Sequence, residues 1–378
     1  MSISLLYHGW GLKGYHDVRT DYDGGRLPLV IQPAPGTLAC PACGCRPRIP
    51  HGGSERIWRQ APIGSKAVFI RMSIPRVECR ECKTIRPVEV GFAAARHTYT
   101  RQVKRYALKR FLKRRFARPK LGKLRQIAID EIASGEGQKD LTVVLDLKSG
   151  AVVFVGQGNG TEALVPFWRR LKRTTACVEA VAMDISKAYI RAVRDHLASA
   201  TIVFDHFHGV KRFNDKFQEF RRPLFHKAST ELERRILKGT RWLLLKNPEN
   251  LVEARNERQR LQKALELNQP LATVYSMKED LRRLGSQKNR KRAARFLCDG
   301  IARARVSGIP MLKKFAKTLQ THVDGILAYY TYPISTGPLE GTHNKIKTMK
   351  RQAYGYRDTE FFMLKILGLH LTKYALVG

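Results

Sequence analysis

The chain has 378 residues, 43% of them hydrophobic, which excludes a disordered protein and predicts a folded chain of two or three domains. Lys and Arg number 70 against 32 Asp and Glu, and the formal charge of +38 indicates a polyanionic partner, with nucleic acid as the first candidate and an anionic membrane surface as the second. No apolar run approaches the roughly 18 residues of a membrane helix, and residues 1–25 lack the layout of a signal peptide, so we expect a cytoplasmic protein with reduced cysteines.

Two pairs of cysteines near the N-terminus have the spacing of metal ligands. Cys40 and Cys43 form one CxxC pair, and Cys79 and Cys82 form the other. In a reducing compartment such pairs predict a tetrahedral structural zinc site, for which Cys45 is an alternative ligand. Free thiols without a metal are the competing interpretation. The gap between the pairs predicts a β-ribbon, which brings its two ends together, with strands at 55–60 and 67–74 and a turn at 62–65.

Residues 98–120 form a strongly basic segment with ten Lys or Arg residues and no acid. Apolar residues recur in it at helical spacing, so the segment predicts one helix. Because no acids balance the charge, we favour a helix that contacts DNA phosphates over a solvated amphipathic helix. The residues expected to make these contacts are Arg101, Lys104, Arg105 and Lys109.

From residue 124 onward, short apolar runs alternate with amphipathic segments. The runs predict three sequential strands followed by two more, with helices between the later ones. This order predicts an α/β fold with a mixed sheet and helices on both of its faces. The expected strands are 124–133, 141–150, 151–158, 178–186 and 201–208, and the expected helices are 161–173 and 187–200.

Carboxylates stand near the ends of three of these strands, at Asp130, Asp184 and Asp205, and the last strand also ends in His206 and His208. Strand ends are where an α/β enzyme places the side chains that bind its ligands and metals. Each aspartate is also in position to cap a following helix, so both interpretations stay open for any one of them. Asp130 and Asp184 taken together favour the metal site.

Residues 228–320 are rich in Leu, Arg, Glu and Lys at helical period, with few strand formers. They predict an all-helical block inside the α/β order. Trp242 is the unusual residue of this block. It is either a core residue or an aromatic side chain that stacks on an unpaired base.

The stretch 335–338, Ser-Thr-Gly-Pro, predicts the start of a helix with a hydroxyl cap and a proline in its first turn. Glu340 then lies in that first turn, where the helix dipole favours an ionised carboxylate. Asn344, Lys347 and Arg351 follow on the same face. Such a face suits a divalent metal, Mg²⁺ first, with phosphates beside it, and the competing interpretation is a capping carboxylate on a DNA-binding helix.

Long stretches of the chain resemble the bacterial DDE transposases of the ISL3 family of insertion sequences. The resemblance runs from residue 36 to the C-terminus and includes both cysteine pairs. The stretches that carry it are IAIDEIA, LTVVLDLKSGAVVFVGQG, AVAMDISKAYIRAV, VFDHFHGVKRFND, LKGTRWLLLKNPENL and YPISTGPLEGTHNKIKTMKRQAYGYRD.

The resemblance implies an RNase H-like catalytic core with a mixed sheet, interrupted by an all-α insertion and preceded by a small zinc ribbon. The implied division is an N-terminal arm at 1–38, the zinc ribbon at 39–90, a basic helix at 91–122, the core at 123–227 plus 321–378, and the insertion at 228–320.

The resemblance also implies a catalytic triad of Asp130, Asp184 and Glu340 that binds two Mg²⁺ ions, with Mn²⁺ as a substitute. Asp205 and His208 match the Asp-x-x-His signature of transposases with helical insertions, and Trp242 matches the insertion tryptophan. DNA contacts are implied at Asn344, Lys345, Lys347, Lys350 and Arg351. The implied reaction is cleavage and strand transfer at the inverted-repeat ends of the element, by a homo-oligomer on double-stranded donor and target DNA in the bacterial nucleoid, with no membrane partner.

Two features depart from the family pattern. Members carry a helix-turn-helix between the zinc ribbon and the first catalytic Asp, whereas this chain has one basic helix there and is expected to lack most of that module. His343 stands where an Asn is expected. The first departure, together with the charge of +38, leaves one alternative to an active transposase, a DNA-binding copy that is catalytically idle or cannot transpose. A third interpretation is an RNase H-type nuclease without a role in transposition.

Overall fold

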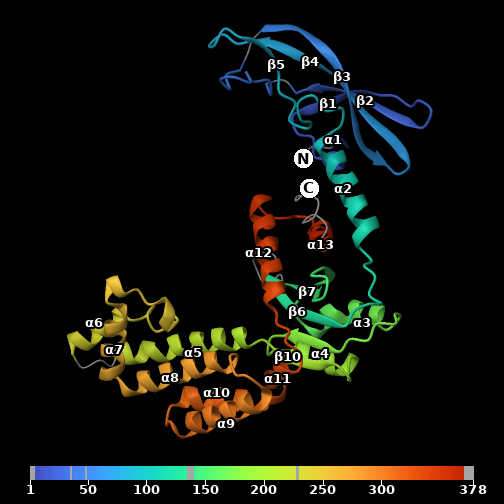
Figure 1. Cartoon of the computed structure of the whole chain (residues 1–378). Coiled ribbons are helices and arrows are strands. Elements are labelled where there is room, and N and C mark those ends of the chain that lie inside the picture. The colour runs from blue at the N-terminus through green and yellow to red at the C-terminus, as the bar shows by residue number, and fades with distance from the viewer. Residues whose placement is uncertain (1–4, 35, 47–48, 134–139, 227–229, 370–378) are drawn as a thin grey trace. The chain divides into compact units, whose positions relative to one another are not determined.

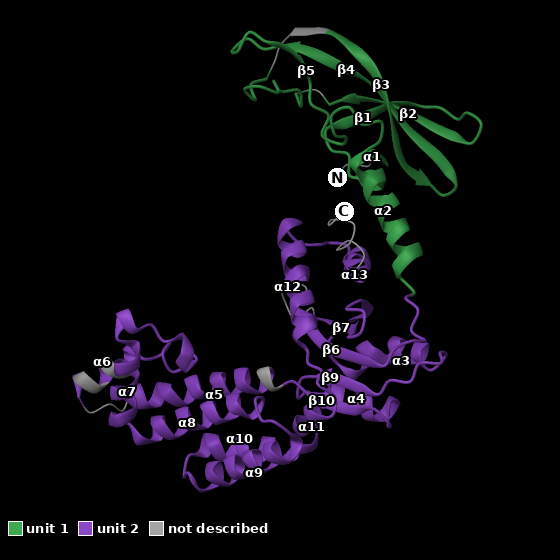
Figure 2. Cartoon of the chain, viewed as in Figure 1, with its two compact units in different colours: residues 1–118 green, residues 119–378 purple. Residues whose placement is uncertain are grey.

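The computed structural model describes residues 5–34, 36–46, 49–133, 140–226 and 230–369 (Figure 1). The chain divides into two compact units, Met1–Arg118 and Pro119–Gly378 (Figure 2). Each unit has a hydrophobic core of its own. Among the described helices, none combines the length and the apolarity needed to cross a membrane.

The first unit is built on a five-stranded sheet in which β1, β2, β4 and β3 lie in that order and β5 pairs with β4. Alternate residues such as Leu29, Ile31, Val68 and Ile70 are buried on one face, as the period of a strand requires. Residues 1–38, expected as an arm, therefore supply two strands of this sheet. The elements are α1 (Leu5–Trp10), β1 (Tyr15–Thr20), β2 (Arg26–Pro33), β3 (Ile49–Ile63), β4 (Lys66–Glu78), β5 (Ile85–Pro87) and α2 (Arg101–Phe116).

The β-ribbon predicted between the cysteine pairs is present as β3 and β4. These strands pair antiparallel, from the residue pair Ile49–Glu78 to the residue pair Ile63–Lys66 at the turn. Its turn contains Gly64 with φ of +57°, a left-handed conformation that suits glycine. The basic helix α2 follows, and its N-terminus is capped by the Thr100 hydroxyl, which accepts the N–H of Val103 at 3.2 Å. Both predictions are confirmed in their type and place.

The second unit contains a mixed sheet in which β10, β9, β6, β7 and β8 lie in that order. The pairs β10–β9 and β9–β6 are parallel, whereas β6–β7 and β7–β8 are antiparallel. The predicted order of three sequential strands and two later ones is therefore confirmed. The strands are β6 (Gln126–Ala133), β7 (Asp140–Asp146), β8 (Val152–Gln157), β9 (Ala180–Met183) and β10 (Thr201–Phe204).

Helices cover both faces of this sheet. One face packs Ile127 and Ile129 against Phe167 of α3 and Tyr189 of α4. The opposite face packs Ala128 and its neighbours against α12 and α13. Two layers of helices around a mixed sheet confirm the predicted α/β class. The helices of these layers are η1 (Thr161–Leu164), α3 (Val165–Leu171), α4 (Lys187–His196), α12 (Gly337–Gln352) and α13 (Thr359–Leu367).

The last two strands are shorter than predicted, since β9 ends at Met183 and β10 at Phe204. His206 and His208, expected at the end of a strand, lie instead in the first turn of α5. The apolar run stops at Phe204, and the polar residues after it leave the sheet.

The predicted all-helical block is confirmed, and its core includes Phe213 and Phe217 of α5 together with Leu271, Val274 and Leu312. The helical body thus begins with α5, immediately after β10. Its elements are α5 (His206–His226), α6 (Glu231–Gly239), η2 (Pro248–Asn250), η3 (Glu253–Arg255), α7 (Glu257–Leu267), α8 (Gln269–Leu284), α9 (Arg290–Val306), α10 (Pro310–Thr321), α11 (Val323–Leu327) and η4 (Ala328–Tyr330).

Candidate active site and zinc centre

Three aspartates lie side by side at one edge of the mixed sheet. In the parallel pair β6–β9, Ile129 lies opposite Met183, so the residues that follow, Asp130 and Asp184, are neighbours. In the parallel pair β10–β9, Phe204 lies opposite Met183, which places Asp205 on the other side of Asp184. The side chains of Asp130 and Asp184 are 14% and 19% exposed, whereas that of Asp205 is 2% exposed. Strand register alone therefore gathers the carboxylates that the sequence marked.

The carboxyl group of Asp130 has a raised pKa. Burial raises its pKa to about 6, and the neighbouring charge of Asp184 adds to this rise, which a hydrogen bond from the Glu131 backbone opposes. Two half-buried carboxylates that repel each other fit a divalent cation, because its charge removes the repulsion and their oxygens are the ligands Mg²⁺ prefers. The donor set at this edge therefore suits the metal that the sequence predicted.

Asp184 contacts two basic side chains of α5. The His208 Nδ1 atom lies 2.9 Å from Asp184 Oδ1, and the Arg212 guanidinium lies 3.7 Å from Oδ2. The contact with Asp184, and next the one with Asp205, raises the pKa of His208 to about 10. His208 is therefore an imidazolium at neutral pH and holds the orientation of the Asp184 carboxylate. Arg212 also donates to the backbone oxygen of Ile185 at 2.9 Å.

Asp205 binds the start of α12 instead of the open edge of the sheet. Its Oδ2 atom accepts the backbone N–H of Thr336 at 2.9 Å and the Thr336 hydroxyl at 2.5 Å. The prediction of a helix start at 335–338 is confirmed, but Thr336, the residue before α12, makes no side-chain capping bond to the helix. Its hydroxyl is engaged by Asp205, and the hydroxyl that bonds the start of the helix is that of Ser335, which accepts the N–H of Gly337 at 3.2 Å.

The helix α12 presents Glu340 and, one turn later, His343 on neighbouring positions of one face. Glu340 is exposed, whereas His343 is 7% exposed and its Nδ1 atom lies 3.5 Å from Asp130 Oδ2. Burial, and next the charge of Lys347, lower the pKa of His343 to about 4, so it is neutral and its contact with Asp130 is not an ion pair. Asp130 lies on the sheet face of Ala128, which α12 covers. The face of α12 that bears His343 is thus turned toward Asp130, and Glu340 lies one turn before His343 at the exposed border of that face.

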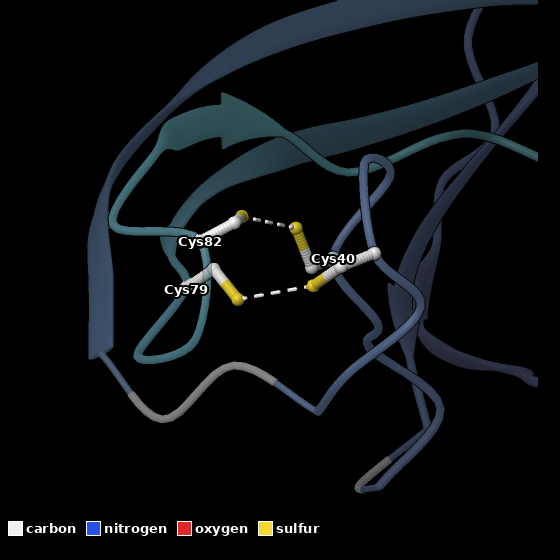
Figure 3. A group of neighbouring side chains, drawn as sticks. Cys40, Cys79 and Cys82 are labelled. Atoms are coloured by element: carbon white, nitrogen blue, oxygen red, sulfur yellow. Dashed lines mark hydrogen bonds between the residues drawn. The ribbon is translucent and has the colours of Figure 1, made fainter.

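The predicted zinc ligands of the first unit form a tight cluster (Figure 3). The sulfur atoms of Cys40 and Cys82 lie 3.6 Å apart, and those of Cys43 and Cys79 lie 3.4 Å apart. Four sulfurs at about 2.3 Å from a tetrahedral zinc ion lie about 3.8 Å from one another, so this cluster matches the shell of such an ion. Cys45 is exposed and supplies its backbone oxygen, which accepts the Cys40 N–H at 2.7 Å.

One thiol of the cluster is prepared for metal binding. The Thr84 hydroxyl lies 3.0 Å from the Cys82 sulfur and, as the largest cause, lowers the pKa of that thiol to about 6. A thiolate is the form that binds zinc. In the part of the chain that the structure describes, this is the one group of three or more Asp, Glu, His or Cys side chains whose ligand atoms all lie within 4.8 Å of one another. The ligand atoms of Asp130, Asp184 and Glu340 do not all lie within that distance of one another.

Comparison with known proteins decides the family. A model of the DDE domain of the ISL3 family, described as Transposase, matches residues 127–366. A second model, described as zinc-finger of transposase IS204/IS1001/IS1096/IS1165, matches residues 37–82. The chain belongs to the ISL3 family of DDE transposases. Enzymes of this class cleave DNA strands and transfer them with the help of divalent metal ions.

Two relatives cover most of the chain. The transposase for insertion sequence element IS1001 of Bordetella parapertussis is 31% identical over 390 residues, which span 95% of each chain. The transposase for insertion sequence element IS1557 of Mycobacterium tuberculosis (strain CDC 1551 / Oshkosh) is 26% identical over 393 residues, which span 89% of this chain and 87% of that one. The family predicted from the sequence is thereby confirmed.

The cations expected to bind DNA in this transposase lie on two helices, one in each unit. Of the four predicted DNA-contacting cations on α2, Lys109 is half-buried and the other three are exposed. Of the five polar residues on α12, Lys350 is half-buried, and the others are exposed. The exposed members are Arg101, Lys104, Arg105, Asn344, Lys345, Lys347 and Arg351. The helix α2 is the one helix in the described stretch between β5 and β6.

Trp242 is 65% exposed, so its interpretation as a core residue is wrong. The Arg241 guanidinium lies over its ring at 4.8 Å from the centroid. Two residues of the site were not predicted: Thr336, which contacts Asp205, and Arg212, which contacts Asp184. Arg212 carried a signal, since it stands one helical turn after His208 on the same face of α5. Thr336 carried none, because its partner lies 131 residues away.

Proposed function

We propose that this transposase cleaves and joins DNA at the inverted-repeat ends of its own insertion sequence, with two Mg²⁺ ions held by Asp130, Asp184 and Glu340. The observation that carries the proposal is the strand register that makes Asp130 and Asp184 neighbours beneath the face of α12. The family and the names of its relatives support the reaction. Mg²⁺ suits the site because it takes few carboxylates and keeps waters and phosphate oxygens as further ligands, and Mn²⁺ is the expected substitute.

Each residue has a separate task in this proposal. A pair of bound metal ions supplies a Lewis acid for the attacking water or 3′-hydroxyl and a partner for the leaving oxygen. Asp130 and Asp184 provide carboxylate oxygens at the end of rigid strands, and Glu340 provides one from the first turn of α12. His208 fixes the orientation of Asp184 through its 2.9 Å contact. Lys347, two turns after Glu340, holds a phosphate of the bound strand.

The basic charge of the chain is proposed to hold double-stranded DNA along α2 and α12. Each phosphate contact releases counterions, so binding should weaken steeply as salt is raised. Because two ends of an element must be cut and joined, we expect a homo-oligomer on DNA that also accepts target DNA. Because the proposed oligomer acts on DNA, we expect to find the protein in the bacterial nucleoid.

Trp242 is proposed to stack on a base that leaves the duplex near the cleavage point. Its exposed ring, with Arg241 beside it, offers both stacking and a positive charge. The other three tryptophans, Trp10, Trp58 and Trp168, are at most 5% exposed. The tryptophan fluorescence that a bound DNA can quench should therefore come mostly from Trp242. A Trp242→Phe variant should lose the DNA-dependent quenching and retain binding. Unchanged quenching in that variant would exclude the contact.

The experiment that tests the proposal is cleavage of labelled DNA that contains the sequences flanking the gene. We expect nicking and joining with Mg²⁺ and none with a chelator. Asp130→Asn, Asp184→Asn and Glu340→Gln should each abolish both steps, while DNA binding persists. Asp195→Asn, a change at a carboxylate that is 58% exposed, is the control that keeps activity.

Two other outcomes would favour the competing functions. Tight, salt-sensitive binding without cleavage under Mg²⁺ or Mn²⁺ would indicate a DNA-binding copy. The single helix α2 between β5 and β6 is the observation behind that alternative. Cleavage without joining would indicate a nuclease. Wild-type cleavage by all three carboxylate variants would overturn the site.

A further inference from the structure

The two ends of the helical insertion meet at one buried pair of side chains. Asp205 follows β10, where the chain leaves the sheet, and Thr336 precedes α12, where the chain returns 131 residues later. The Asp205 side chain is 2% exposed and Thr336 is 1% exposed. Oδ2 of Asp205 accepts both the N–H and the hydroxyl of Thr336. Hydrogen bonds to a buried carboxylate are among the stronger contacts in a protein.

Thr336 also holds the backbone of Glu340. Its carbonyl oxygen accepts the N–H of Glu340 at 2.9 Å, the first hydrogen bond of the helix. The position of Glu340 relative to the sheet is therefore set through one residue, whose N–H is fixed by Asp205 and whose C=O is fixed to Glu340. The Thr336 hydroxyl lies 3.3 Å from His208 Nδ1, which in turn contacts Asp184. Thr336 thus contacts the backbone of Glu340 directly and reaches Asp184 through His208.

We propose that Asp205 and Thr336 form a latch that positions Glu340 against Asp130 and Asp184. The inference rests on the metal-binding role of Glu340 in the proposed function. Thr336 acts through Glu340 and touches no reacting atom, so it is a positioning residue. Because the latch joins the two connections of the insertion, displacement of the helical body acts on Glu340 through the same contact.

A double-mutant cycle on metal binding tests the latch without any turnover. Mn²⁺ binding to the zinc-loaded full chain, in the absence of DNA, is measured by the loss of the free-ion electron paramagnetic resonance signal. Thr336→Val removes the hydroxyl donor at nearly constant volume and should weaken Mn²⁺ binding about tenfold, the usual scale for a residue that orients a ligand. Thr336→Ser keeps the donor and should restore binding. Thr348→Val, on the same helix, removes a hydroxyl that bonds the helix backbone and should have no effect.

The cycle separates this inference from the proposed function. Glu340→Gln should weaken Mn²⁺ binding, and adding Thr336→Val to it should weaken binding no further, within about twofold, because the two residues act as one unit. A full additional loss in the double variant would overturn the latch and leave the role of Glu340 intact. Unchanged binding in Glu340→Gln alone would overturn the metal role of Glu340, and with it the latch. If Thr336→Val does not fold, Asp205→Asn takes its place in the same cycle.

Discussion

Replacing Asp130 with Asn should stabilise the protein while it abolishes cleavage. Burial raises the pKa of Asp130 from the ordinary 3.8 to about 6. A raised carboxyl pKa means that the folded protein holds a proton that the unfolded chain releases. The resulting stability is fully present below pH 4 and is lost as the pH rises through 6. Above pH 6 the ionised carboxylate therefore destabilises the fold, and an amide of the same shape removes that cost.

The size of this effect follows from the two pKa values. The difference between 3.8 and about 6 corresponds to about 3 kcal/mol, at about 1.4 kcal/mol for each pH unit. At pH 8 the Asp130→Asn variant should be more stable by up to that amount. For a unit as large as the second one, each kcal/mol added to the free energy of unfolding raises the melting temperature by about 2–4 °C. The advantage should shrink between pH 6 and pH 4 and vanish below pH 4.

The assay is thermal or urea unfolding of both proteins across pH 4 to 8, with and without Mg²⁺. Mg²⁺ should stabilise the wild type and not the variant, because bound metal neutralises the ionised carboxylate. The control is Asp195→Asn, which alters an exposed carboxylate and should show little pH-dependent difference. A variant less stable than the wild type at pH 8, or a stability difference that does not change with pH, would refute the reasoning.

Three further predictions concern other parts of the chain. Cys82→Ser should lose the bound zinc and unfold the first unit, as measured by metal analysis and circular dichroism, and a variant with full zinc content would contradict the site. His208→Ala should lower the rate of cleavage by about 10- to 100-fold with little change in DNA affinity, because Asp184 loses its orienting partner. A change in DNA affinity with an unchanged cleavage rate would argue against an orienting role for His208. Lys278→Met should destabilise the helical body by about 3 kcal/mol in urea unfolding, because the buried ammonium donates to the carbonyl oxygens of Leu244 and Lys246 and lies 2.8 Å from Glu279, and the two carbonyl oxygens would lose that donor. Equal stability of the variant would exclude the ammonium as a stabilising group.

The sheet and the aspartates at its edge could be predicted because they depend on local patterns. Short apolar runs marked the strands, and their order along the chain restricted the topology. Once two strands are parallel neighbours, the residue at the end of each lies beside the other. Asp130 and Asp184 therefore could be paired from the sequence, although their exposure and the pKa of Asp130 could not.

The contacts of Asp205 and His343 could not be predicted from local patterns. Asp205 looked like a third ligand at a strand end, yet its partner Thr336 lies beyond the whole helical insertion. His343 was noted only because it stands where the family has an Asn, and the packing of α12 on the sheet buries it against Asp130. Both depend on how distant segments meet, which a sequence pattern does not encode.

The first 38 residues show the opposite case, a feature that local patterns encode and that was expected only as an arm. Leu27, Leu29 and Ile31 alternate with more exposed residues, which is the signal of a half-buried strand. Pro28 lies within the run although proline is rare in interior strands, and β2 lies between β1 and β4. The strand pairs in parallel with β4, a partner that lies after the zinc ligands Cys40 and Cys43 in the chain.

The most direct measurement is the anomalous scattering of a crystal of the full chain grown with Mn²⁺. The account predicts a manganese peak between the carboxylates of Asp130 and Asp184, with Glu340 within reach, and a separate zinc peak among the four cysteine sulfurs. A manganese peak at another pair of acids, such as Glu131 and Asp140, would contradict the site. A crystal with zinc at the cysteines and no manganese at the sheet edge, at concentrations that support cleavage, would contradict it equally.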